Sequence, residues 1–261
     1  MRKFRAILII SAIVLLLTPR LPVHSGSDVP DTINHGPTVT SNSEAVYEIR
    51  EIEGWQVHVS RKLLETQTVA TAKSLELLQA QLKGIVAVVP TAAVARLREV
   101  ALWVSPEYPG FSPRAEYHPD AGWLRANKRN PAMAKGVEFT NVRIFESEVK
   151  RMPVFVLHEL AHAYHDRFLG FDHPEIKTAY LHALAGKKYD AVKRYFADGT
   201  SRVERAYAMT DEHEYFAEGT EAYFGRNDFF PFTRNELETH DPELFKLMGR
   251  VWNTGAVGKK E

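Results

Sequence analysis

The segment Val154-Phe155-Val156-Leu157-His158-Glu159-Leu160-Ala161-His162-Ala163-Tyr164 decides how this chain of 261 residues is interpreted. Its apolar character predicts a buried helix. His158 and His162 are four residues apart, so both imidazoles lie on one helix face and can point at one metal ion. Glu159 can reach a water on that ion and take its proton as a general base. The alternative is a chance match that contains two ordinary helix histidines.

A catalytic zinc ion needs a third protein ligand and one open position. The chain has no cysteine, which excludes a thiolate ligand. The metzincin pattern would place Gly at position 165 and His at position 168, but the chain has His165 and Phe168 there. A carboxylate further along the chain is therefore the best candidate for the third ligand.

A second predicted helix, residues 211–224, carries three acids on one face. Glu214, Glu218 and Glu221 are spaced at 0, +4 and +7, and like charges so close together repel unless a cation or hydrogen-bond donors lie opposite. We expect Glu214 to be the third ligand and Glu218 to hold a ligand imidazole in place. Glu221 is expected to be a solvated or structural acid. The alternative for Glu214 is a capping box with Asp211 at the start of the helix.

Four other residues are weaker candidates. Near the metal, the phenol of Tyr207 could donate to the oxyanion that develops during hydrolysis; the alternative is a tyrosine that packs its ring at the end of a strand. His165 could be an alternative ligand or a supporting donor, but the pattern favours a histidine on the helix surface. Tyr117 and His118 lie in a proline-rich stretch and could line a cleft.

A family resemblance supports these assignments. The run from Tyr207 to Glu218 resembles the corresponding stretch of the anthrax lethal factor catalytic domain, a zinc peptidase of the zincin class. The wider region, residues 100–252, is similar to a group of small secreted bacterial metallopeptidases. The resemblance implies that Glu214 is the third zinc ligand, that Glu218 follows it in the same helix, and that Tyr207 helps to stabilise the tetrahedral intermediate. The toxin's targeting domains have no counterpart here, so its substrate choice is not transferred.

The composition narrows the possible partners and the compartment. Thirty-three basic residues balance 33 acidic ones, so no basic field indicates a nucleic-acid partner. Residues 1–25 have a positive start and a short apolar run, the pattern of a signal peptide, and residues 26–44 read as a flexible linker. We therefore expect a secreted or periplasmic protein with no stable membrane association after cleavage. An uncleaved N-terminal anchor is the alternative.

The remaining pattern predicts one α+β domain over residues 45–258, a zincin-like fold in which a small mixed sheet packs on the metal-binding helix. Residues 45–90 could form a small N-terminal subdomain. Residues 105–135 are expected to be mostly loop, and residues 153–170 one long helix. We expect strands at residues 47–52, 55–59, 86–89, 100–104, 136–142, 189–196 and 202–208. By analogy with zincins, the strand at 136–142 could pair with an extended substrate.

These observations lead to one expectation of function and one alternative. The chain is expected to be an exported endopeptidase that uses a single Zn²⁺ and a water activated by Glu159. Two histidines and one carboxylate also suit iron or manganese. The alternative is an exported binding module that keeps a structural zinc on the same fold without turnover. Hydrolysis of a non-peptide amide, such as one in a cell wall, would use the same site.

Overall fold

The structure is a computed structural model that describes residues 46–253. The strands are β1 Tyr47–Ile52, β2 Trp55–Ser60, β3 Leu102–Val104, β4 Ala115–Tyr117, β5 Val137–Phe139, β6 Val192–Tyr195 and β7 Ser201–Glu204. The helices are α1 Arg61–Thr66, α2 Thr68–Val88, α3 Thr91–Leu97, α4 Ala121–Ala126, α5 Phe145–Arg151, α6 Phe155–Tyr164, α7 Pro174–Ala185, α8 Glu212–Phe224, α9 Arg234–His240 and α10 Pro242–Asn253. This is a mixed α+β architecture, as the sequence predicts.

The main sheet has five strands in the order β1-β2-β3-β5-β4. The first two strands form an antiparallel hairpin, whose turn is at Glu53 and Gly54, both at positive φ. Strands β2, β3 and β5 are parallel to one another, and β4 pairs antiparallel with β5. As a result β4 lies at one edge of the sheet, and β5 is an internal strand. A separate hairpin joins β6 and β7.

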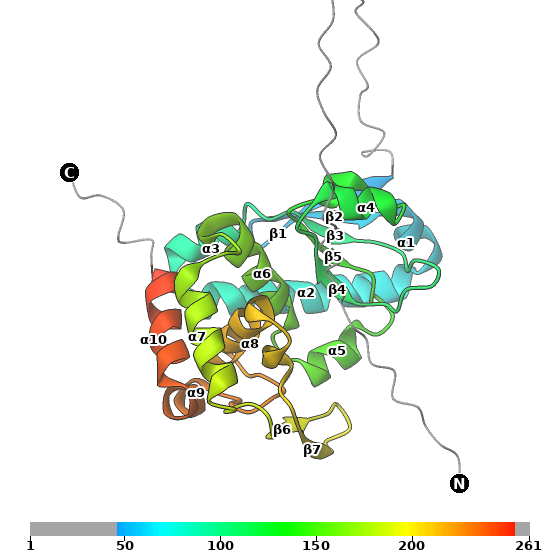
Figure 1. The fold of residues 1–261 in the computed structure, drawn as a ribbon. Coiled ribbons are helices and arrows are strands. Elements are labelled where there is room, and N and C mark those ends of the chain that lie inside the picture. Colours follow the sequence, from blue (N-terminus) through cyan, green and yellow to red (C-terminus); the bar gives the residue numbers. More distant parts are fainter. Residues whose placement is uncertain (1–45, 254–261) are drawn as a thin grey trace, which may run out of the picture. The chain divides into compact units, whose positions relative to one another are not determined.

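The two faces of the sheet pack against different elements. Because side chains alternate along a strand, Leu102 and Val104 of β3 join the large core that also contains side chains of α2, α6, α8 and α10. Trp103 between them belongs to a smaller cluster on the opposite face, with Leu124 of α4 and Met133. Helix α6 lies between the sheet and the C-terminal helices (Figure 1). It is buried along most of its length, which gives its polar side chains a fixed setting.

Helices α6 and α8 carry the predicted ligands and pack against each other. Asp211 caps α8, because its carboxylate accepts hydrogen bonds from the amides of His213 and Glu214. Helix α6 continues into a π-helical turn, His165–Leu169, and Gly170 follows at a φ of 86°. With a ψ of 131°, Gly170 lies in a region that only glycine adopts readily, so the chain leaves the helix there.

Several boundaries differ from the prediction. Residues 86–89 are not a strand, because the apolar face of α2 continues through Ile85 to Val89 and keeps this stretch helical almost to its end. Residues 105–135 are mostly loop, as predicted, and the loop is interrupted by three short elements that the sequence did not indicate: β4, α4 and a 3-10 turn at Pro131–Met133. The long helix predicted from Pro153 is α6, which begins at Phe155, followed by the π-helical turn. Helix α9 was not expected, although Thr233 and Glu236 form a capping box at its start.

The predicted N-terminal segments fall outside the part of the chain that the structure describes. These are the signal peptide, residues 1–25, and the linker, residues 26–44. Among residues 46–253, no helix is both long and apolar enough to span a bilayer. Side chains from residues 55–89 belong to the same large core as those of α6 and α8, and the described residues 46–253 all lie within one compact unit.

Candidate metal centre

Three side chains predicted to bind a metal come together between α6 and α8. His158 Nε2 lies 3.1 Å from His162 Nε2 and 3.2 Å from Glu214 Oε2, and His162 Nε2 lies 3.4 Å from the same carboxylate oxygen. His158 is buried, and the other two residues are largely buried. We call these three residues the metal-site triad. They come from two helices that are about 50 residues apart in sequence and adjacent in space.

The spacing of the triad fits a tetrahedral metal ion. A tetrahedron with metal–ligand bonds of about 2.0–2.1 Å has edges of about 3.3–3.4 Å, close to the three separations above. Glu214 Oε2 is buried and has no hydrogen-bond partner. A buried carboxylate oxygen without a donor is costly, so the environment of Glu214 calls for a cation or a proton.

Electrostatics lead to the same conclusion. Burial alone would lower the pKa of His158, but the adjacent carboxylates of Glu214 and Glu221 raise that pKa well above its ordinary value. Burial alone would raise the pKa of Glu214, but the close approach of the His162 and His158 imidazoles holds that pKa well below its ordinary value. Both shifts mean that the acids and the imidazoles favour added positive charge at this point. A divalent cation supplies that charge more compactly than two protons.

The carboxylate that holds a ligand imidazole is Glu221, not Glu218. His158 Nδ1 lies 2.8 Å from Glu221 Oε1, and Glu221 is fully buried rather than solvated. Helices α6 and α8 run antiparallel, since His158 contacts Glu221, His162 contacts Glu214 and His165 packs on His213. The His158 ring therefore lies between two carboxylates of α8, with Nε2 toward Glu214 and Nδ1 toward Glu221. An acceptor on Nδ1 fixes the tautomer that leaves Nε2 free for a metal. The +7 spacing of Glu221 predicts that it shares a face of α8 with Glu214, but the sequence does not show in which direction α6 runs across α8.

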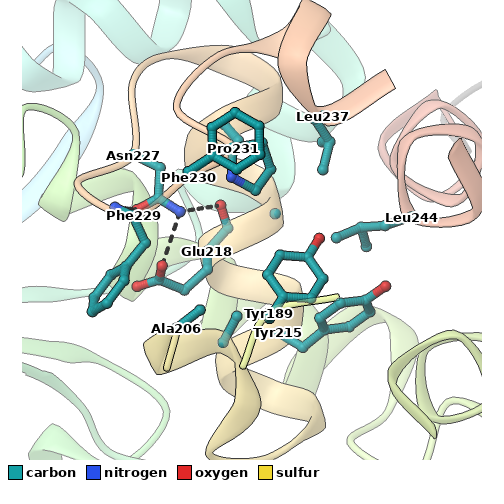
Figure 2. Close-up of a pocket in the computed structure, with 13 residues that line it drawn as sticks. Tyr189, Ala206, Tyr215, Glu218, Asn227, Phe229, Phe230, Pro231, Leu237 and Leu244 are labelled. Atoms are coloured by element: carbon teal, nitrogen blue, oxygen red, sulfur yellow. Dashed lines mark hydrogen bonds between the residues drawn. The ribbon is translucent and has the colours of Figure 1, made fainter. Parts of the chain in front are cut away.

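Glu218 lies near His158, since His158, Glu218 and Glu221 each place a ligand atom within 4.8 Å of the others. The Glu218 carboxylate accepts a hydrogen bond from Asn227 Nδ2 at 2.8 Å and borders a small cavity lined by aromatic side chains such as Tyr189, Tyr215 and Phe230 (Figure 2). Burial raises the pKa of Glu218 well above its ordinary value. This residue is therefore part of the packing behind the site, and it makes no hydrogen bond to His158 or His162 among those in the described residues.

Glu159 lies beside the triad on the same turn of α6. Its Oε2 accepts a hydrogen bond of 2.9 Å from the backbone amide of Tyr117 on β4. Burial raises the pKa of Glu159 above its ordinary value. A carboxylate with a raised pKa is a better proton acceptor near neutral pH than an exposed glutamate.

Tyr207 contacts the triad at Glu214. It begins a short 3-10 turn, Tyr207–Met209, rather than ending a strand, and its hydroxyl donates to Glu214 Oε1 at 3.1 Å. Its side chain is 37% exposed, so it faces solvent rather than packing its ring in the core. The hydroxyl is therefore placed where it could turn from Glu214 toward a bound substrate.

His165 is not the surface histidine that the pattern favoured. It is fully buried, and neither ring nitrogen has a hydrogen-bond partner. Its ring packs against Phe216, Phe171 and His213 at centroid distances of 5.0, 5.4 and 5.3 Å. It is not part of any of the three histidine and carboxylate groups in the described residues that could hold a metal.

A second histidine and carboxylate cluster lies on the far face of the sheet. Glu116, His118 and Glu138 also bring their polar atoms within 4.8 Å of one another. Here, however, the buried guanidinium of Arg129 contacts Glu116 at 2.6 Å and Glu138 at 3.3 Å. We call this set the arginine-filled cluster. His118 therefore lies in this buried network and does not line the metal site, whereas Tyr117 faces it.

Comparison with known proteins adds no relative to this description. No protein-family model, no curated protein and no solved structure matches this chain.

Proposed function

We propose that this protein is a zinc-dependent peptidase. The observation that carries the proposal is the convergence of the triad's three ligand atoms, 3.1–3.4 Å apart, around a buried Glu214 oxygen that has no hydrogen-bond donor. Two imidazoles and one carboxylate are a common donor set for catalytic zinc, and they leave one coordination position open. A zinc ion there would polarise the scissile carbonyl and lower the pKa of water.

The residues around the triad support hydrolysis rather than metal storage alone. Glu159 is partly buried beside the triad and serves as the general base that accepts the proton of the attacking water. The Tyr207 hydroxyl serves as a donor to the oxyanion, a role in which one donor is worth about 3–4 kcal/mol of transition-state stabilisation. Glu221 holds His158 in the orientation that leaves Nε2 available to bind a metal.

The sheet edge beside Glu159 favours an extended peptide as the substrate. The strand expected to pair with substrate, β5, is enclosed by β3 and β4, so it has no free edge. The free edge belongs to β4, where the backbone N–H and C=O of Ala115 point away from β5. A peptide that lies along this edge would add a strand to the sheet. The pattern of residues 1–25 supports an exported enzyme.

The experiment measures the zinc content of the full-length chain together with hydrolysis of a broad peptide library. We expect one zinc per chain in the wild type and in Glu159→Gln, and turnover that is about 10²- to 10⁴-fold lower in the variant. Glu175→Gln is the matched control, because Glu175 is an exposed acid paired with Arg250 on the surface.

Two outcomes would contradict the proposal: a protein that binds no metal, or a Glu159→Gln variant with wild-type turnover. Stoichiometric zinc without hydrolysis of any peptide would favour a binding module with a structural metal.

A further inference from the structure

We infer that Tyr117 is a positioning residue for the general base. Its backbone amide binds Glu159, and its phenol binds the turn at the end of the ligand helix, so Tyr117 connects the edge strand to that helix at two points. This inference rests on the proposed function, in which Glu159 accepts the proton of water. The juxtaposition that carries it is one residue of β4 with two separate hydrogen bonds to the segment that contains His158 and His162.

The amide of Tyr117 lies on the outer edge of the sheet. The hydrogen bonds from His118 N to Gly136 O and from Thr140 N to Arg114 O show that positions 114 and 118 of this segment face β5. Because backbone groups alternate along an antiparallel strand, the amides of Ala115 and Tyr117 point outward. An outward amide normally binds water or a partner strand, but here it donates to Glu159 Oε2 at 2.9 Å.

The side chain of Tyr117 makes a second connection. Its hydroxyl donates to Asp166 Oδ2 at 2.6 Å, and Asp166 belongs to the π-helical turn that continues α6. Lys135 forms an ion pair with the same carboxylate oxygen. The phenol is largely buried, and its ring packs edge-on against Phe171 at a centroid distance of 6.4 Å. Single π-type turns often mark functional sites, and this turn directs Asp166 toward β4.

The two contacts fix the orientation of Glu159. A carboxylate has two oxygens, and a hydrogen bond to Oε2 leaves Oε1 for the water. Without that bond the side chain would sample several rotamers, only some of which present an oxygen to the water. The phenol contact with Asp166 holds β4 at the distance from α6 at which its amide reaches Glu159. Loss of the phenol contact should therefore lower the rate of the chemical step more than substrate binding.

The first test does not depend on activity. Amide hydrogen exchange is measured by NMR on the full chain, with the Ala115 amide as the internal reference on the same edge. We expect the Tyr117 amide to exchange at least about tenfold more slowly than that of Ala115, and Glu159→Ala to remove the difference. Equal exchange at the two positions in the wild type would overturn the inference, whether or not the protein hydrolyses peptides.

The second test compares kinetic constants at full zinc occupancy. We expect Tyr117→Phe and Asp166→Ala to lower kcat about tenfold with KM within twofold of the wild type. Asp166→Asn should recover most of the loss, since its amide oxygen still accepts the phenol hydrogen.

An unchanged kcat in Tyr117→Phe, or an increase in KM with kcat preserved, would overturn a positioning role. Absence of all wild-type turnover would instead count against the proposed function, and the exchange experiment would still decide whether Tyr117 holds Glu159.

Discussion

The metal-site triad and the arginine-filled cluster use the same kinds of residue and differ in what neutralises them. Both bring histidine and carboxylate atoms within 4.8 Å of one another in a buried setting. In the cluster, the Arg129 guanidinium contacts two carboxylates and stacks on three aromatic rings at 4.5–4.8 Å. In the triad, no basic side chain of residues 46–253 forms an ion pair with Glu214 in this way; its ion-pair partners there are the imidazoles of His158 and His162.

This difference separates a metal site from a structural network better than residue type does. Burial alone would raise the pKa of Glu138 in the cluster, but hydrogen bonds from His118, Ser105 and Tyr108 lower it. The carboxylate oxygens of that cluster are thus supplied with donors. Glu214 Oε2 has none and lies between two imidazole nitrogens. A group of histidines and carboxylates therefore fits a metal site best when the carboxylate oxygen at its centre has no hydrogen-bond donor from the protein.

The largest expected effect is a loss of stability when the arginine of the arginine-filled cluster is removed. Arg129→Met leaves the carboxylates of Glu116 and Glu138 without their cation, and removal of one partner from a buried ion pair costs about 3–5 kcal/mol of unfolding free energy. Denaturant unfolding followed by circular dichroism measures this loss. We further expect added Zn²⁺ to recover part of it, because the vacated space then resembles the triad.

Lys73→Ala is the control for this experiment, since its ion pair with Glu76 is exposed and should contribute less than about 1 kcal/mol. Equal stability of Arg129→Met and Lys73→Ala would contradict the structural role assigned to the arginine.

A smaller effect is expected on the zinc affinity of the metal-site triad. Glu221→Gln weakens the hydrogen bond that orients His158, so the affinity for zinc should fall about 10- to 100-fold. Glu218→Gln is the matched change one turn earlier on the same helix, and it should alter zinc affinity less. Competition with a chromophoric chelator measures both affinities. A larger loss in Glu218→Gln would restore the assignment made from the sequence and remove Glu221 from its role.

The exchange of Glu218 for Glu221 shows what the sequence could and could not predict. Periodicity placed Glu214, Glu218 and Glu221 on one face of α8, and the capping aspartate at position 211 located the start of that helix. These are local properties that depend on a few adjacent residues. Which carboxylate meets His158 depends on the antiparallel packing of α6 on α8, which no local pattern encodes.

The sheet illustrates the same limit. The hairpin of β1 and β2 was predicted within one residue, because its alternation and its Glu53-Gly54 turn are local signals. Strand β4 has only three residues, lies in a stretch rich in proline, and exists because β5 lies beside it. The amide that holds Glu159 belongs to this strand. A part of the site therefore follows from strand pairing and could not be found from spacing.

The smallest expected effect concerns a buried histidine outside both groups. Burial lowers the pKa of His165 to about 3, whereas the unfolded chain has a pKa near 6.5. As pH falls below 6.5, this imidazole takes up a proton in the unfolded state but not in the folded state. The contribution of His165 to the free energy of unfolding is therefore complete above pH 6.5 and is lost as pH falls toward 3. Between pH 6.5 and 5.5 the expected loss is about 1 kcal/mol.

Urea unfolding of the wild type and His165→Phe at several pH values measures this contribution. The variant should lose less stability over this interval. His182→Phe serves as the control, because His182 is exposed on α7. Parallel stability curves for the wild type and His165→Phe would show that the buried imidazole does not titrate as described.

Zinc binding by the metal-site triad is tested most directly by an anomalous-difference map. The data come from a crystal of the zinc-loaded protein and are collected on both sides of the zinc absorption edge. We predict one peak per chain in the described region, within about 2.0–2.2 Å of His158 Nε2, His162 Nε2 and a Glu214 carboxylate oxygen. No peak between these atoms, or a peak at the arginine-filled cluster instead, would show that the metal-site triad is not the zinc site.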